Sequence, residues 1–190
     1  MFGEDSAVEH VESAPPELAR TPDEEIEIAA ERIQASLVAD VRSQLDQLDA
    51  YRFEHVVLDV LKAMGYGGGR MNAGVVTQRS NDEGIDGVIN EDKLGLDVIY
   101  VQAKKWASNV GRPEVQAFVG ALAGKQANKG VMISTSGFAK NAYEYAQAVQ
   151  QKVILIDGAR LAELMIEHNV GVSVARTINI KRVDSDYFEG

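Results

Sequence analysis

The feature that most constrains the fold is an alternation of short apolar runs with helical segments in the second half of the chain. VMIS (131–134) and KVILI (152–156) have the length and composition of buried strands. Each run precedes a segment with helical spacing of apolar residues, FAKNAYEYAQAVQ and GARLAELMIEH. A strand, a crossover helix and a second strand form a parallel pair, so we predict an α/β domain.

Residues 84–104, GIDGVINEDKLGLDVIYVQAK, are predicted to form two strands around a turn. Alternate side chains of a strand point to opposite faces, so Gln102 and Lys104 share one face. A hairpin symmetric about Leu94 places Asp86 across from Gln102, close enough for the side chains to meet. We therefore expect an acid, an amide and a lysine to converge on one spot. AGVVTQ is a further predicted strand, so the sheet begins antiparallel and continues through a crossover.

The N-terminal part of the chain is predicted to differ from the rest. Residues 1–20 mix acids, alanines and two prolines without a period, which indicates a disordered or linker segment. Thr21-Pro22-Asp23-Glu24 has the form of a capping box, and a helical apolar stripe follows, so we expect an amphipathic linker helix over residues 21–48. Residues 49–190 then form the main domain, which starts with a helix capped by Asp49.

Composition excludes several classes of function. The chain of 190 residues has no cysteine, so disulfides, thiolate metal sites and cysteine nucleophiles are excluded. No stretch approaches the roughly 20 apolar residues of a membrane span, and the first ten residues lack the pattern of a signal peptide, so we expect a cytoplasmic protein without membrane contact.

The net charge of −10 is unevenly distributed. Residues 1–50 hold 3 basic and 13 acidic side chains, whereas residues 51–180 hold 14 and 13. Basic side chains gather in one stretch, opposed there only by Glu114: Lys104, Lys105, Arg112, Lys125 and Lys129. This stretch predicts contacts with the phosphates of DNA, and we single out Lys105, Arg112 and Lys125; a solvated charged surface is the alternative.

The three polar groups of the hairpin have a chemistry that suits phosphodiester hydrolysis. Mg²⁺ in proteins takes one or two carboxylates and keeps several waters. Asp86, the Gln102 amide and the Ala103 backbone carbonyl are candidate ligands, and Glu54 supplies a second acid if its helix packs across the hairpin. Lys104 would orient a water or help to deprotonate it. The alternative is an ordinary ion pair between an Asp and a Lys on neighbouring strands.

Four segments together resemble the catalytic domain of Mrr-type restriction endonucleases, which belong to the PD-(D/E)XK nuclease superfamily: FEHVVLDVLKAMGYGG, GIDGVINEDKLGLDVIYVQAKKW, VGRPEVQAFVGALAG and VILIDGARLAELMIEHNVGV. The resemblance runs from about residue 48 to the C-terminus. It implies a restriction-endonuclease-like fold, a central mixed β-sheet flanked by helices, here preceded by the long N-terminal helix. It also implies cleavage of double-stranded DNA with Mg²⁺, for which Mn²⁺ substitutes.

The resemblance also assigns residues. Glu54, Asp86, Gln102 and Lys104 occupy the matching catalytic positions, and the Mrr group carries glutamine where most relatives have an acid. By analogy with RecB-type nucleases, Gln116 on the following helix also points at the site.

Two departures from the family pattern leave alternatives open. Ser80-Asn81-Asp82-Glu83 replaces a glycine-rich run before Asp86, so the loop is stiffer and more acidic. Mrr proteins usually carry a winged-helix DNA-recognition domain before the catalytic half, and residues 1–20 cannot fold into one. Either the chain is the catalytic half of a longer protein, or a separate domain or subunit targets it. A catalytically silent DNA-binding or assembly module and a junction-resolving or repair nuclease are the other functions considered.

Three further features have two interpretations each. Ser136, after a predicted strand, either caps the next helix or helps to hold a phosphate. Trp106 either packs at the strand end or stacks on DNA. The apolar stripe from Ile33 to Leu48 packs on the domain or on a second subunit, and we favour a homodimer because two active sites would cut two strands. Asp157 is expected to cap the last helix.

Overall fold

The structure is a computed structural model that describes residues 20–67, 74–76, 84–92 and 94–190. Residues 1–19 of the expected linker and the loop Ser80–Glu83 lie outside the described residues. The helices are α1 (Pro22–Gln47), α2 (Ala50–Ala63), α3 (Arg112–Gly124), α4 (Lys140–Ala148), α5 (Gly158–Glu167) and α6 (Ser185–Phe188). The strands are β1 (Gly74–Val76), β2 (Gly87–Asn90), β3 (Val98–Lys104), β4 (Lys129–Ser134) and β5 (Lys152–Ile156).

The strands form one mixed sheet in the order β1-β2-β3-β4-β5. The pairs β1–β2 and β2–β3 are antiparallel, and β3–β4 and β4–β5 are parallel. This confirms the expected α/β sheet. The β2–β3 register, from Gly87 opposite Val101 to Asn90 opposite Val98, is the one that symmetry about Leu94 predicts.

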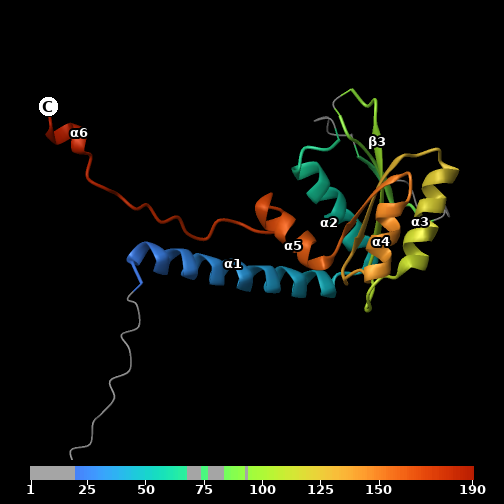
Figure 1. The fold of residues 1–190 in the computed structure, drawn as a ribbon, viewed down its shortest axis with the longest axis horizontal. Helices are drawn as coiled ribbons and strands as arrows, with labels where there is room; N and C mark the ends of the chain where they lie inside the picture. Colours follow the sequence, from blue (N-terminus) through green and yellow to red (C-terminus); the bar gives the residue numbers. More distant parts are fainter. Residues whose placement is uncertain (1–19, 68–73, 77–83, 93) are drawn as a thin grey trace, which may run out of the picture. The chain divides into compact units, whose positions relative to one another are not determined.

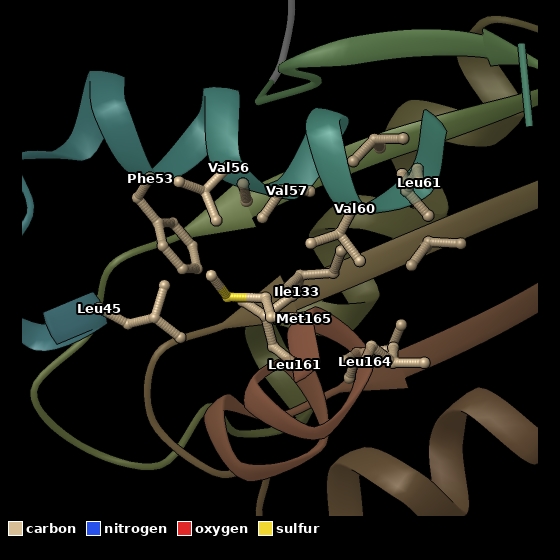
Figure 2. Close-up of a cluster of buried hydrophobic side chains, with 14 of the residues drawn as sticks. Leu45, Phe53, Val56, Val57, Val60, Leu61, Ile133, Leu161, Leu164 and Met165 are labelled. Atoms are coloured by element: carbon tan, nitrogen blue, oxygen red, sulfur yellow. The ribbon is translucent and has the colours of Figure 1, made fainter. Parts of the chain in front are cut away.

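Helices cover both faces of this sheet, with α2 and α5 on one face and α3 and α4 on the other (Figure 1). Val101 and Ala103 of β3 point into the core shared with α2 and α5, where Phe53 and Leu161 are fully buried (Figure 2 shows this cluster). Tyr100, the residue before Val101, points to the opposite face and packs against the core under α3 and α4. Gln102 and Lys104 follow Tyr100 on that second face.

Several expected helix ends are confirmed, and one is wrong. Thr21 and Glu24 exchange the two hydrogen bonds of a capping box, at 2.8 and 3.3 Å. The Asp49 and Asp157 carboxylates accept from the N–H groups that start α2 and α5, each at 2.8 Å. Ser136 does not cap α4, because that helix begins four residues later, at Lys140, with Ala139 at the N-cap position.

The apolar stripe of α1 is divided. Val41 and Leu45 are buried in the core with α2 and α5, whereas Ile33 is 70% exposed. The chain separates between Ser36 and Leu37 into two compact units. The last three turns of α1 are therefore part of the α/β domain. In the described part of the chain, α1 and the other helices lack the apolar length needed to cross a membrane.

Candidate active site

Asp86 lies at the entry to β2, where the chain makes an irregular pairing with β3. The Asp86 N–H donates to the Val101 carbonyl at 2.9 Å, while Gly87 is the register partner of the same Val101. Two residues opposite one are the mark of a β-bulge, which re-aims a side chain. The Asp86 carboxylate accepts from the Ala103 N–H, with an Oδ2–N distance of 2.7 Å. The carboxylate is thus fixed by the backbone of β3.

Gln102 and Lys104 extend from β3 toward the turn that precedes Asp86. The Gln102 side chain is buried, and its Nε2 donates to the Gly84 carbonyl. An ideal Cβ placed on Gly84 would overlap Gln102 Nε2 and would lie 4.0 Å from Lys104 Nζ. Both side chains therefore lie against Gly84, which also has a φ of +87°. Sequence reasoning missed this residue; the signal was a glycine two positions before the acid, at the turn into a strand.

The Asp86 carboxyl has an unusual electrostatic setting. Burial raises its pKa above the ordinary value, and the Ala103 N–H together with the positive charge of Lys104 offsets part of that effect. A carboxyl group with a perturbed pKa, a cation beside it and partial solvent access is typical of functional sites. The setting favours ligands that compensate the buried negative charge.

Glu54 lies on α2, a helix that packs on the other face of the sheet from Gln102 and Lys104. It is half-buried on α2, one turn before Leu58. A Cβ on Gly87 would lie 3.1 Å from Leu58 Cδ2, so α2 crosses β2 directly beside Asp86. Lys105 Nζ donates to the Leu48 carbonyl at 2.5 Å, which ties the start of α2 to the end of β3. Glu54 therefore lies between two contacts with the sheet: that of Leu58 with β2, and that of the Leu48 carbonyl with Lys105 after β3.

The donor set suits a hard divalent cation. The N–H and C=O of a strand residue point to the same edge, so the Ala103 carbonyl faces the Asp86 side, as its N–H does. Across the described ranges, no three His, Cys, Asp or Glu side chains gather closely enough to bind a metal. One or two carboxylates with neutral oxygens and waters are what Mg²⁺ accepts, whereas structural zinc needs four protein ligands. The residues present fit Mg²⁺.

Among the basic residues proposed for DNA contact, the structure does not bring all into one patch. Arg112 and Lys125 lie at opposite ends of α3, about 20 Å apart along the helix. The Arg112 guanidinium lies over the Tyr145 ring, 4.9 Å from its centroid. Lys129, from the same sequence stretch, binds Glu91 and Asp97 at the hairpin turn, and these bonds raise the pKa of Lys129.

The two supporting residues occupy different environments. Gln116 is exposed on α3, the helix on the sheet face to which Gln102 and Lys104 point. Ser136 lies in the loop after β4, where its hydroxyl donates to the Ser108 carbonyl at 2.7 Å. That hydrogen bond links the loop after β4 to the loop after β3.

A mixed sheet whose irregular hairpin carries an acid, an amide and a lysine at one end defines a class of nuclease-like α/β domains, and the comparisons with known proteins agree. A family model for a restriction endonuclease domain, Mrr_cat, matches residues 45–165. The chain belongs to this family of restriction endonucleases.

Two curated relatives extend this result. The chain is 49% identical over 174 residues to the type IV methyl-directed restriction enzyme EcoKMrr of Escherichia coli (strain K12), a match that covers 91% of the chain and 56% of that enzyme. It is 30% identical over 139 residues to the uncharacterized protein y4cE of Sinorhizobium fredii (strain NBRC 101917 / NGR234), covering 67% of the chain and 34% of that protein. The chain thus spans about half the length of the first relative and about a third of the length of the second.

A solved structure supports the fold. The DNA modification-dependent restriction endonuclease AspBHI superposes with a TM-score of 0.54 at 20% identity, over 84% of the chain and 41% of that protein. This likeness agrees with the restriction-endonuclease-like sheet predicted from the sequence.

Proposed function

We propose that the chain is a Mg²⁺-dependent DNA endonuclease of restriction type that hydrolyses phosphodiester bonds in double-stranded DNA. The observation that carries the proposal is the placement of Asp86 beside Ala103 and of Gln102 and Lys104 against Gly84, at one end of β3. Membership of the restriction endonuclease family supports it. The Escherichia coli relative is a bacterial protein, and bacterial DNA lies in the cytoplasm, so we propose that this chain acts there.

In this proposal, Asp86 and Glu54 hold Mg²⁺ (or Mn²⁺), with the Ala103 carbonyl and the Gln102 amide as neutral ligands. When bound, the cation neutralises negative charge on the scissile phosphate and on the leaving oxygen. The Ala103 N–H occupies one oxygen of Asp86 and leaves the other for the cation. Glutamine brings no charge, so the affinity depends strongly on Asp86.

Lys104 has the catalytic role next to this cation. Its ammonium group, close enough to Asp86 to lower the pKa of that carboxyl, would orient the attacking water and stabilise the hydroxide that forms when this water gives its proton to solvent. The Gln102 side chain donates to the Gly84 carbonyl and so ties β3 to the turn that precedes Asp86. Gln116 is proposed as a supporting polar group, and Lys105, Arg112 and Lys125 as contacts to DNA phosphates.

A plasmid-nicking assay tests the proposal. Wild-type protein should convert supercoiled plasmid to nicked or linear DNA in Mg²⁺ or Mn²⁺ and not in EDTA. Asp86→Asn keeps the shape and an acceptor for the Ala103 N–H but removes the charge, so we expect a loss of roughly a hundredfold or more. Asp59→Asn, an exposed site on α2, is the matched control and should cleave normally. Full activity of Asp86→Asn would remove this carboxylate from the mechanism.

A catalytically silent DNA-binding module is the second candidate. The stretch Ser80-Asn81-Asp82-Glu83, which replaces a glycine-rich run of the family before Asp86, motivates it. Titration calorimetry with Mg²⁺ and Mn²⁺ in the presence of DNA separates the two. Binding that disappears in Asp86→Asn supports the nuclease, and an absence of binding at millimolar metal supports the silent module.

The target of cleavage is a further proposal. The Escherichia coli relative is methyl-directed, and the chain spans 56% of it. We propose that this chain also acts on modified DNA, with targeting by a separate domain or subunit. Comparing methylated with unmethylated plasmid tests the first part, and equal cleavage of both would contradict it. Four-way junctions as a competing substrate test the junction-resolving alternative.

We also propose a homodimer through the exposed half of the α1 stripe. Ile26 and Ile33 are 44% and 70% exposed on one long helix. Light scattering should show a dimer at micromolar concentration, and Ile33→Glu should shift it to monomer. A monomeric wild type would contradict this part alone.

A further inference from the structure

A polar groove of about 570 Å³ lies at the carboxyl ends of β3 and β4, outside the set of residues proposed to bind the metal. Its lining includes Arg42, Asp46, Lys105, Trp106, Asn109 and Ser136. In α/β sheets, ligands bind in the crevice at the carboxyl ends of the parallel strands. The position and the mixed lining therefore point to a ligand site.

The floor of the groove is held rigidly by hydrogen bonds that continue the β3–β4 pairing past the strand ends. Thr135 Oγ1 accepts from the Trp106 N–H and donates to the Trp106 carbonyl, both at 3.2 Å. Ser136 Oγ donates to the Ser108 carbonyl at 2.7 Å, and the Val110 N–H donates to the Gly137 carbonyl at 2.9 Å. A rigid floor lowers the ordering cost of binding.

Two cationic side chains, Arg42 and Lys105, line the groove. Lys105 Nζ donates to the Leu48 carbonyl, and an ammonium group has three donors, so two remain for a ligand. Arg42 is exposed on the last turns of α1, and its planar guanidinium suits phosphate oxygens. Asp46, one turn after Arg42, also lines the groove, so these three side chains sum to a charge of +1.

The groove continues directly from the proposed catalytic residues. The Lys104 carbonyl accepts from the Thr135 N–H at 3.2 Å, so the groove begins where Lys104 ends. Trp106 follows Lys104 by two residues, about 7 Å in extended chain, and packs on the same face. Since a DNA strand rises about 3.4 Å per nucleotide, a phosphate in this groove would lie within a few nucleotides of the scissile one.

We propose that this groove binds the DNA strand flanking the scissile phosphate. Arg42 and Lys105 contact one phosphate, and Trp106 packs against the adjoining sugar or base. The inference rests on the proposed endonuclease function. It makes Arg42 a substrate-positioning residue on the part of α1 that belongs to the α/β domain, outside the residues 45–165 that match the family.

The chain offers a direct probe, because Trp106 is its only tryptophan. We would titrate the full chain with a fluorescein-labelled 20-base-pair duplex in EDTA, where cleavage does not run, to measure anisotropy. A parallel titration with unlabelled duplex would measure Trp106 emission. DNA binding and a change of Trp106 emission should have the same midpoint.

Variants then test the role of Arg42. Arg42→Ala should weaken duplex binding roughly tenfold at low salt and reduce the salt slope by about 1, the value for one phosphate contact. Arg42→Lys, which keeps the charge, should retain most of the affinity. Arg32→Ala, the same charge change ten residues earlier on α1 and outside the groove lining, is the matched control and should bind as wild type.

Four outcomes would overturn the inference. Anisotropy that reports binding while Trp106 emission stays constant would place the DNA elsewhere and leave the endonuclease proposal intact. Equal affinities and salt slopes for Arg42→Ala and Arg32→Ala would do the same. Inorganic phosphate or a deoxynucleoside monophosphate that changes Trp106 emission at the concentrations at which duplex does would make the groove a small-anion site. Wild-type protein that binds no duplex would also overturn the inference, whereas the plasmid-nicking assay tests the endonuclease proposal separately.

Discussion

At the scale of single residues, Gly84 sets the geometry of the candidate site although it carries no functional group. Its φ of +87° is one that other residues rarely adopt, and its missing Cβ leaves room for the Gln102 amide. Lys104 Nζ lies 4.0 Å from the same Cβ position. The Gln102 and Lys104 side chains therefore have room at this turn because residue 84 has no side chain, a feature that a search for reactive residues does not detect.

Gly84→Ala should affect cleavage more than stability. The new Cβ would displace the Gln102 amide, which lies beside Lys104 at this turn, so we expect cleavage to fall roughly tenfold or more. The left-handed φ adds a stability cost of about 1–2 kcal/mol. Gly65→Ala is the control, because Gly65 has a φ of +99° but nothing within 4 Å of its Cβ position. Plasmid nicking and urea unfolding of both variants measure the two effects, and equal nicking rates would contradict the role given to Gly84.

The pKa of Asp86 gives a pH dependence with a definite sign. Burial raises the pKa of Asp86 in the folded chain above 3.8, its ordinary value and the one expected in the unfolded chain. At a pH between 3.8 and the folded-state pKa, the folded chain therefore holds a proton that the unfolded chain has lost. The stability contributed by Asp86 is therefore complete below about pH 3.8 and is lost as pH rises through the folded pKa. In urea unfolding with EDTA, the free energy of unfolding of the wild type should fall relative to that of Asp86→Asn as pH rises from 4 to 7.5. A difference that is constant with pH would contradict the shift.

At the scale of elements, the parts that local chemistry determines were predicted well. The β2–β3 register about Leu94 follows from the alternation of side chains. Asp49 and Asp157 cap their helices, as expected for an acid that directly precedes a helical apolar stripe. Ser136 was mistaken for a cap because a serine after a strand has the same local pattern. Its hydroxyl instead bonds to Ser108, 28 residues away in the chain, which no local pattern reports.

For the candidate site, the sequence predicted which residues of β3 share a face, and it predicted few of their contacts. The alternation along β3 is enough to put Gln102 and Lys104 on one face. The bulge at Asp86, which sends the carboxylate to the Ala103 N–H, depends on how two strands meet and has no sequence period. The side of the sheet from which Glu54 approaches depends on the packing of α2, including the contact of Leu58 with Gly87.

Asp49 links an element to the site, because it starts the helix that carries Glu54. Asp49→Ala should remove the bond to the Arg52 N–H and cost about 1 kcal/mol of unfolding free energy. Asp59→Ala, an exposed position in the same helix, should cost less than half of that. Thermal or urea unfolding measures both, and similar losses in the two variants would show that the cap contributes nothing specific.

At the scale of the whole molecule, the α/β domain extends into the helix before it. The last turns of α1 bury Val41 and Leu45 in the core with α2 and α5, and Arg42 on the same turns lines the polar groove. A boundary at residue 48 would cut through this packing. The domain boundary proposed from the sequence at residue 49 is better drawn near Leu37, where the compact unit begins.

The most direct test of the central claim is the rate of plasmid cleavage by Lys104→Ala under single-turnover conditions in Mg²⁺, beside Lys62→Ala as a charge-matched control in the last turn of α2. Duplex affinity of each variant would be measured in the same buffer. The account predicts that Lys104→Ala loses cleavage by roughly a hundredfold or more while binding falls only slightly, and that Lys62→Ala behaves as wild type. Cleavage by Lys104→Ala at the wild-type rate would contradict the assignment of this end of β3 as the active site.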